Sequence, residues 1–526
     1  MYIIKISLLF LLTTSLLTVT NAQEIKITVQ PENKFQTVEG FGAALAYYEN
    51  WLTSHPNKTE IYEAIFGELS LDILRVRNAY DYDAGMVARV KEFITASEKV
   101  RGNPIPFLTT SWGPPAYLKS NNDRNNGGTL KYTVSDGKVQ FDYNGFANWW
   151  NASLDNYEAN GISPSYISIQ NEPDWKASYE SCLLNPFEKV NSTDTLAGYN
   201  KALQAVHDMV AKRSKVPKML GPECIGIGYN AVKNYVLQLD TTLLTGIAHH
   251  LYHGIDVNNP WDNTEMTNLN KLYPNLKLYQ TEYSGNDWFN LSGLMYKSFA
   301  DEQAVAYFYW DLAWDNGGLV SMDNPWSSGT WKTTKGYSKT KEFYAFKQFS
   351  AFVQPGWQRV EVTAASTAIE SVAFMSPGQD SLSVIVINRS TVGEKEIRFE
   401  LSGFEFTQSN LFATSSTLNC EPEGELNDST ATLSAKSINT ALFIKTFKDG
   451  IGELKNEITN ALTIYPNPLR NKAQIKGVAI NEPWQLYSMD GSLIQTGSGT
   501  QLDASELMQG MYLLKTRQKS VKLIKQ

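Results

Sequence analysis

The sequence predicts an α/β protein: a (β/α)8 TIM barrel with an associated β-sandwich, followed by a small second β-sandwich at the C-terminus. Between residues 38 and 354, short β-prone runs alternate with amphipathic helical stretches. Polar and aromatic residues gather where those runs end, as the active face of such a barrel requires. From residue 355 the pattern changes to short alternating strands. A doubly wound sheet is disfavoured because the sequence has no glycine-rich phosphate loop.

The barrel is predicted from apolar runs that are each followed by a segment of helical period, such as residues 86–99, 143–160 and 196–213. The predicted strands are residues 38–43, 72–77, 104–111, 166–171, 216–221, 246–252, 276–282 and 303–310.

The remaining segments give the domain organisation. Residues 1–22 have the pattern of a signal peptide, with Lys5, an apolar stretch and a small-residue exit at Ala22. No later apolar run is long enough to span a membrane, so we expect a secreted or surface-attached protein. The predicted domains are residues 23–37 with 355–447 (β-sandwich), 38–354 (catalytic barrel), 448–460 (linker) and 461–526 (C-terminal module).

Charge and the placement of cysteine and histidine argue against nucleic acid, a disulfide framework and a metal site. The formal net charge of -8 argues against nucleic acid. The three cysteines permit at most one disulfide, and a bridge between Cys182 and Cys224 is left open. No His or Cys cluster has the spacing of metal ligands, so we expect neither a metal nor a cofactor.

A carboxylate is predicted at the tip of the fourth strand. The apolar run 166–169 ends in Asn171-Glu172, and Pro173 prevents the strand from continuing. Glu282 ends the seventh strand in the same way, so both carboxylates lie on one rim. Two carboxylates that flank a glycosidic bond can cleave it. The tripeptide Asn481-Glu482-Pro483 repeats the motif without such a partner, so the prediction rests on the pairing.

Neighbouring residues suggest how the two glutamates divide their roles. We expect Arg75 to hold Glu282 ionised as the nucleophile, with Tyr252 and Tyr283 positioning it, while Glu172 acts as the acid/base. Asn171 can bind a sugar 2-hydroxyl group. Glu223 also ends a strand, and a structural or binding role is expected for it.

Further substrate contacts are predicted from residue type and position. Several tryptophans fall at strand ends or in the loops after them, where flat rings suit the apolar faces of sugars. His250 fits either a core histidine or a substrate contact. The predicted binding aromatics are Trp112, Trp288 and Trp310, together with Trp175 and Trp314 as members of the same group.

Residues 24–447 resemble glycoside hydrolase family 30. The motifs that carry the resemblance are Glu39-Gly40-Phe41-Gly42, Ile73-Leu74-Arg75, Ser111-Trp112, Gln170-Asn171-Glu172-Pro173, His250-Leu251-Tyr252, Gln280-Thr281-Glu282-Tyr283 and Trp310-Asp311-Leu312-Ala313. The resemblance implies a barrel with a β-sandwich beside it, and retention of anomeric configuration by double displacement.

Within that family, residues 166–174 look most similar to the xylanase branches, which implies cleavage of β-1,4-xylan. Enzymes of those branches that require glucuronate bind it with an arginine, but residues 311–337 contain only Lys332 and Lys335 as basic residues. We therefore expect no strict need for glucuronate branches. Alternatives are a β-1,6-glucanase, a β-1,6-galactanase or a β-glucosidase, or a non-catalytic glycan-binding surface protein. A monomer is expected.

The C-terminal module resembles the sorting domain of the type IX secretion system of Bacteroidetes. Three segments carry this resemblance, residues 464–468, 486–491 and 510–515. The resemblance implies the type IX secretion machinery as a partner. The alternative is a small carbohydrate-binding domain.

Overall fold

The protein is described from a computed structural model. The structure describes residues 24–252, 259–323, 331 and 334–445, and residues 462–525 apart from 466, 468, 470, 477, 479–481, 489–491 and 517–519. The predicted signal peptide and linker lie outside these residues. The chain divides into two compact units, residues 1–447 and 448–526.

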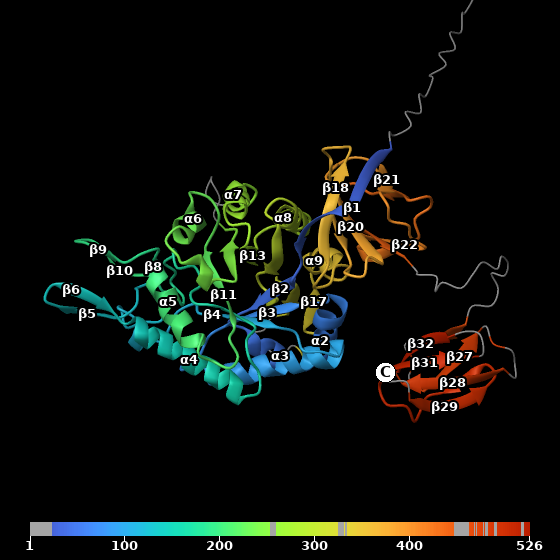
Figure 1. The fold of residues 1–526 in the computed structure, drawn as a ribbon, viewed down its shortest axis with the longest axis horizontal. Helices are drawn as coiled ribbons and strands as arrows, with labels where there is room; N and C mark the ends of the chain where they lie inside the picture. Colours follow the sequence, from blue (N-terminus) through green and yellow to red (C-terminus); the bar gives the residue numbers. More distant parts are fainter. Residues whose placement is uncertain are drawn as a thin grey trace, which may run out of the picture. The chain divides into compact units, whose positions relative to one another are not determined.

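The first unit contains the predicted barrel of parallel strands (Figure 1). The fourth strand, β7, ends at residue 168 rather than 171, because the chain turns out of the sheet before Glu172. The closed barrel consists of β2 (Gly40–Leu45), β3 (Ile73–Arg77), β4 (Phe107–Thr110), β7 (Tyr166–Ser168), β11 (Lys218–Cys224), β12 (Gly246–His250), β13 (Lys277–Glu282) and β14 (Ala304–Tyr309).

Alternate strand residues fill the interior of the barrel, since successive side chains point to opposite faces. Leu108, Leu220 and Phe308 belong to this inner cluster and are buried. Gly42 faces the Phe308 ring so closely that a Cβ would collide with it. The carboxylate of Glu39, just before β2, accepts hydrogen bonds from the hydroxyls of Tyr166 and Tyr279, each at 2.7 Å.

Helices cover the outside of the barrel, and several begin with a side-chain cap. Asp142, Asp287 and Thr340 each accept a hydrogen bond from a backbone N–H in the first turn of the helix that follows. The α-helices are α1 (Glu49–Thr53), α2 (Lys58–Tyr62), α3 (Met86–Arg101), α4 (Tyr143–Ala159), α5 (Tyr199–Val210), α6 (Ala231–Val236), α7 (Thr264–Leu272), α8 (Trp288–Ala300) and α9 (Lys341–Ser350).

Short strands lie in the loops of the barrel and form small sheets of their own. They are β5 (Tyr132–Ser135) and β6 (Lys138–Phe141); β8 (Leu184–Asn185), β9 (Lys189–Val190) and β10 (Thr195–Gly198); and β15 (Ala313–Asp315), β16 (Val320–Met322) and β17 (Tyr337–Lys339).

The side domain is one hydrogen-bonded sheet that curls over on itself. Phe399 on β21 and Phe443 on β25 have ring centroids 5.3 Å apart, although four strands separate β21 from β25 in the sheet. A flat sheet would place strands in those positions about 24 Å apart, so its two halves face each other as a sandwich. The sheet order is β23 (Asn419–Gly424), β22 (Gln408–Thr414), β25 (Ser437–Ile444), β20 (Ser381–Asn388), β19 (Ile369–Met375), β18 (Gln358–Ala364), β1 (Ile25–Thr37), β21 (Lys395–Leu401), β24 (Thr430–Leu433).

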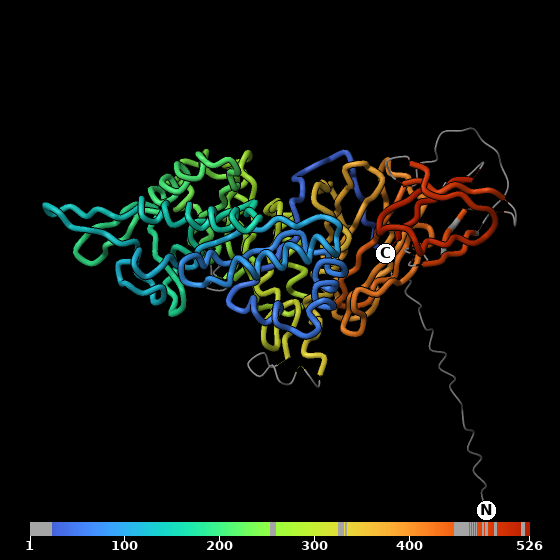
Figure 2. Tube along the Cα trace, turned by 90° about the horizontal axis from the view of Figure 1, so that it is seen from below, coloured from blue at the N-terminus to red at the C-terminus, as the bar shows by residue number. Residues whose placement is uncertain are grey.

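The side domain draws its strands from both ends of the catalytic region. Figures 1 and 2 show the N-terminal strand β1, in blue, running among the yellow and orange strands of the sheet. β1 pairs antiparallel with β18 and parallel with β21. Helices of the barrel seal the junction: the Phe299 and Phe374 rings lie 5.7 Å apart, and Gln348 donates to Thr414 over 2.9 Å.

The second unit contains two small sheets around its own core. Trp484, Leu486, Leu514 and Leu523 are among its buried side chains. One sheet pairs β26 (Thr463–Tyr465), β27 (Lys472–Lys476) and β30 (Gln501–Asp503), and the other pairs β29 (Leu493–Ser498), β28 (Pro483–Ser488), β31 (Gly510–Lys515) and β32 (Ser520–Lys525).

The fold bears on two expectations from the sequence, a possible disulfide and the lack of a membrane span. Cys182 and Cys224 are free thiols, so the bridge that was left open does not form in this structure. Within the described residues, no helix has both the length and the apolar character needed to cross a bilayer.

Candidate active site

Glu172 lies just beyond the carboxyl end of β7, at the rim of the barrel. Its backbone is left-handed, with φ of +45°, which a non-glycine residue rarely adopts. The Glu172 N–H donates to the Glu223 carbonyl over 3.0 Å, and this bond ties the loop to β11. Such strained conformations are characteristic of functional sites. The local backbone thus turns the Glu172 side chain toward its neighbours on the next strands.

Glu282 is the last residue of β13 and faces a buried arginine. Arg75 on β3 is fully buried, and its Nη1 lies 2.6 Å from Glu282 Oε2. The other guanidinium nitrogen, Nη2, donates to Asn171 Oδ1 over 2.7 Å. One planar guanidinium therefore fixes both the Glu282 carboxylate and the Asn171 amide. The contact that the sequence suggested between Arg75 and Glu282 is present.

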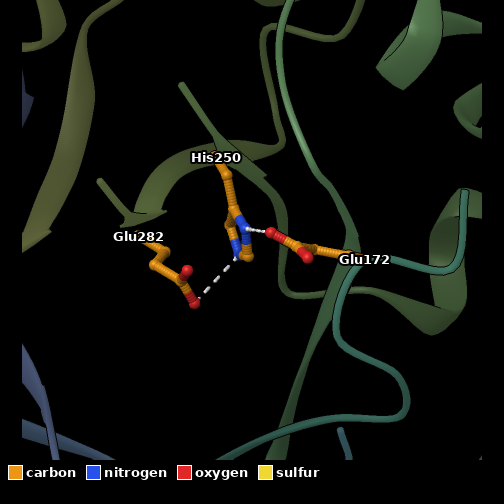
Figure 3. Close-up of side chains that lie close together, drawn as sticks. All are labelled: Glu172, His250 and Glu282. Carbon is orange, nitrogen blue, oxygen red and sulfur yellow. Dashed lines mark hydrogen bonds and ion pairs between the residues drawn. The ribbon is translucent and has the colours of Figure 1, made fainter. Parts of the chain in front are cut away.

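His250, at the end of β12, lies between the two glutamates (Figure 3). Its Nδ1 is 3.0 Å from Glu172 Oε1, and its Nε2 is 4.0 Å from Glu282 Oε2. The ligand-type atoms of Glu172, His250 and Glu282 all lie within 4.8 Å of one another. Figure 3 shows both carboxylates directed at the imidazole from separate elements.

The protein environment shifts the pKa values of Glu172 and His250 to different values. Burial raises the pKa of Glu172 to about 7, and repulsion from Glu282 adds to the effect although the hydrogen bond from His250 opposes it. Burial would lower the pKa of His250, but the carboxylates of Glu282 and Glu172 raise it to about 9. Near neutral pH, His250 is therefore a cation and Glu172 can still carry its proton.

Glu223 is a third carboxylate behind the pair. It is fully buried on β11, and Arg75 Nε lies 3.3 Å from its Oε1. Burial would raise the pKa of Glu223, yet the Arg75 charge lowers it to about 2. The sequence expectation of a structural or binding role, rather than a nucleophilic one, agrees with this position away from the cavity.

A cavity of about 550 Å³ opens above the two glutamates. Its walls are mainly aromatic, which suits the apolar faces of sugar rings. Trp112, Trp310 and Trp314 form a row, with ring centroids 5.9 Å and 6.2 Å apart along it. The lining residues are Tyr47, Tyr48, Trp112, Asn171, Glu172, Tyr179, Ile225, Tyr252, Glu282, Trp310 and Trp314.

Some predicted site residues lie outside this lining. Arg75 and His250 are buried beneath the glutamates and contact them instead of the cavity. The Tyr283 ring packs against Tyr252, with centroids 5.2 Å apart. Trp288 begins α8, where Lys341 Nζ lies 5.6 Å from its ring centroid. Trp175 is also not among the lining residues, and 40% of it is exposed.

Sequence reasoning missed three aromatic residues of the cavity. Tyr47 and Tyr48 follow the end of β2, so their place at a strand end was a usable signal. Tyr179 lies in the long loop after β7, and no pattern in the sequence singles it out.

Comparisons with known proteins found similar sequences for both units. Residues 463–526 match the family model for a secretion system C-terminal sorting domain. The chain is 25% identical over 433 residues to lysosomal acid glucosylceramidase of Mus musculus, covering 69% of this chain and 77% of the relative. It is 24% identical over 441 residues to glucuronoxylanase XynC of Bacillus subtilis, covering 80% and 91%.

The fold also has counterparts among solved structures. The catalytic domain of the GH30 xylanase C of Talaromyces cellulolyticus superposes with a TM-score of 0.63 at 19% identity, covering 80% of this chain and 100% of that one. This likeness shows that the first unit has the fold of that catalytic domain. The match of residues 463–526 shows a type IX sorting domain that marks the chain for export.

Proposed function

Because the first unit is a relative of glycoside hydrolase family 30 and the second is a secretion sorting domain, we propose that this protein is a secreted retaining glycosidase that cleaves β-1,4-xylan. The observation that carries the mechanism is the pairing of Glu172 and Glu282, with one carboxylate oxygen of each within 4.8 Å of the other. Retaining enzymes place their carboxyl groups about 5–5.5 Å apart, whereas inverting enzymes leave room for a water molecule between them. The spacing favours double displacement.

In the first step Glu282 acts as the nucleophile. A carboxylate oxygen of Glu282 bonds to the anomeric carbon while the bond from that carbon to the glycosidic oxygen breaks. Glu172 gives its proton to the departing oxygen, which the raised pKa of about 7 makes possible near neutral pH. Arg75 compensates the Glu282 charge before the attack. The product is a covalent glycosyl-enzyme.

In the second step the roles of Glu172 reverse. Its carboxylate takes a proton from a water molecule, whose oxygen bonds to the anomeric carbon as the bond to Glu282 breaks. Asn171, fixed by Arg75, lies in the cavity wall beside Glu172, where it can bind the 2-hydroxyl group of the sugar. Two inversions at one carbon return the original configuration.

The choice of xylan rests on the motifs of residues 166–174 and on the chemistry of the cavity. Within the described part of the chain, the lining residues include neither Arg nor Lys. Charge-assisted bonds from Arg or Lys bind a carboxylate most strongly, so a lining without them favours unbranched or neutrally substituted xylan. The alternative is another β-glycan of the same family, such as a β-1,6-glucan, a β-1,6-galactan or a β-glucoside. The relative that acts on a glucosylceramide favours keeping the glucoside in the test.

One substrate panel tests the proposal. Purified enzyme is incubated with linear xylo-oligosaccharides, glucuronoxylan, arabinoxylan, β-1,6-glucan, β-1,6-galactan and an aryl β-glucoside, and products are followed by chromatography. We expect cleavage of linear xylo-oligosaccharides, with the β-anomer formed first in proton NMR. Cleavage of glucuronoxylan alone would contradict independence from glucuronate, and cleavage of only a glucan, galactan or glucoside would replace the substrate.

A further inference from the structure

We propose that Glu223 is a positioning residue of this site, which acts through His250 and Arg75 on the acid/base and the nucleophile without touching the substrate. The inference rests on the proposed glycosidase function. Glu223 is a fully buried carboxylate that the two displacement steps do not use. A buried charge is costly unless it is paired, so its presence needs a reason.

Glu223 is linked to each catalytic glutamate through one other side chain. Arg75 Nε lies 3.3 Å from Glu223 Oε1, and the same guanidinium contacts Glu282. His250 Nε2 lies 4.0 Å from Glu223 Oε1, and the same ring contacts Glu172 through Nδ1. Glu223 thus lies beside both cations that contact the reacting carboxylates.

The orientation of His250 depends on this arrangement. Its Nε2 is buried without an aligned hydrogen bond, and it points between two carboxylates, each at 4.0 Å. Both oxygens of Glu223 are likewise buried without an aligned hydrogen bond. Charge attraction rather than hydrogen-bond geometry therefore holds the pair, and it favours the imidazolium with a proton on each nitrogen.

The charges of the cluster explain what Glu223 adds. Three carboxylates, Glu172, Glu223 and Glu282, surround two cations, Arg75 and the protonated His250. With Glu172 protonated the cluster is neutral. Without the Glu223 charge, the same cluster would carry one excess positive charge, and His250 is the group that can release it. The Ser168 and Tyr199 hydroxyls also interact with Glu223, and both remain neutral.

The backbone links the residue to the site in a second way. Glu223 has a left-handed φ of +59°, like Glu172 with +45°, and its carbonyl accepts the Glu172 N–H. Two strained non-glycine residues joined by one hydrogen bond are costly for a purely structural role. A carboxylate kept only for packing would not require either feature. Glu223 is also absent from the cavity lining, which separates it from the residues that bind sugar.

The test compares Glu223→Gln with a matched control, Glu302→Gln. Glu302 is also a buried carboxylate, 3.0 Å from Nε2 of the adjacent histidine His249, and it precedes β14, at the end of the barrel opposite the rim that carries Glu172 and Glu282. The first readout is the pH titration of the His250 imidazole by NMR on protein labelled at histidine Cε1, assigned with His250→Asn. We expect Glu223→Gln to lower the titration midpoint of His250 by about two pH units or more, to or below that of Glu172, and Glu302→Gln to leave it unchanged.

The second readout is the pH dependence of hydrolysis. With His250 neutral, Glu172 loses a cation at 3.0 Å, so the alkaline limb of kcat/KM should move to higher pH in Glu223→Gln. We expect kcat to fall about 10- to 100-fold, with little change in KM, because Glu223 does not contact the cavity. Glu223→Asp keeps the charge and should restore part of the loss. If Glu223→Gln does not fold, Glu223→Asp tests the proposal by a smaller lowering of the His250 midpoint, because its shorter side chain moves the carboxylate away from the imidazole.

An unchanged His250 midpoint in Glu223→Gln, or an equal shift in Glu302→Gln, would overturn the proposal. The NMR readout requires no turnover, so it tests the role of Glu223 whether or not the protein is active. Failure of the wild-type protein to hydrolyse any of the tested glycans would instead refute the proposed function.

Discussion

Glu172 Oε1 and His250 Nδ1 lie 3.0 Å apart in a contact that is closed to solvent. The pair joins a carboxylic acid whose pKa is raised to about 7 to an imidazole whose pKa is raised to about 9. His250 is therefore a cation beside the acid/base, and its hydrogen bond lowers the pKa of Glu172, which burial raises. The pH dependence of the enzyme should follow from this contact.

The rate should decline on the alkaline side of neutrality. As the pH rises through about 7, Glu172 loses the proton that it must give to the leaving oxygen, so kcat/KM falls. The pH profile of hydrolysis of a xylo-oligosaccharide measures this limb. Glu172→Gln should lower kcat/KM by about 10²- to 10⁴-fold and remove the limb. A limb that persists in Glu172→Gln would assign it to another group.

Replacement of the nucleophile should stop turnover without unfolding the protein. Glu282→Gln keeps the size of the side chain but removes the charge that attacks the anomeric carbon, and we expect kcat to fall by roughly 10⁴-fold or more. Circular dichroism and thermal melting should match the wild type within a few degrees. Retention of about one thousandth of the wild-type rate or more would argue against Glu282 as the nucleophile.

The row of tryptophans should determine substrate affinity. Trp314 lines the cavity, so Trp314→Ala should raise KM about three- to tenfold, which corresponds to a loss of roughly 0.5–1.5 kcal/mol of aromatic contact. Trp288→Ala is the matched control, because Trp288 was predicted to bind sugar but lies outside the lining. Steady-state kinetics of both variants would distinguish the two sites, and an equal rise in KM would place Trp288 in the binding surface after all.

Packing inside the barrel should not tolerate even one added methyl group at residue 42. A Cβ on Gly42 collides with the buried Phe308 ring, so Gly42→Ala should reduce the free energy of unfolding by about 1–3 kcal/mol. In Gly317→Ala the new Cβ would meet nothing nearer than 3.7 Å, so its stability should be close to that of the wild type. Denaturant titrations of both variants measure the difference.

The C-terminal unit should be dispensable for catalysis. The two units have separate hydrophobic cores, and the cavity is lined entirely by residues of the first unit. A chain that ends at residue 447 should fold and retain the kcat and KM of the full-length enzyme on soluble oligosaccharides. In a bacterium with type IX secretion, the same truncation should abolish export. A shortened chain that is still exported would separate the tail from sorting.

Much of the architecture could be predicted from the sequence because it depends on local patterns. Alternating apolar runs and helical periods predict the barrel, since each strand and helix must bury one face. Strand ends marked by Glu172, Glu282 and Trp310 identify the active rim. The arrangement of Arg75 beside Glu282 also follows from parallel strands that share one rim.

The tertiary structure determined which side chains from different strands and loops lie together, and the residue pattern of a single strand does not specify this. Tyr179 reaches the cavity from a long loop, whereas Trp288, the first residue of α8, lies outside the cavity lining. His250 lies between Glu172 and Glu282, outside the cavity lining, and Glu223 is the third carboxylate beside Arg75 and His250. The sequence by itself determined which residues stand at the ends of the strands, because hydrophobic periodicity is local. Only the closure of the barrel decided which of them touch, because it brings together side chains from four strands that are far apart in the chain.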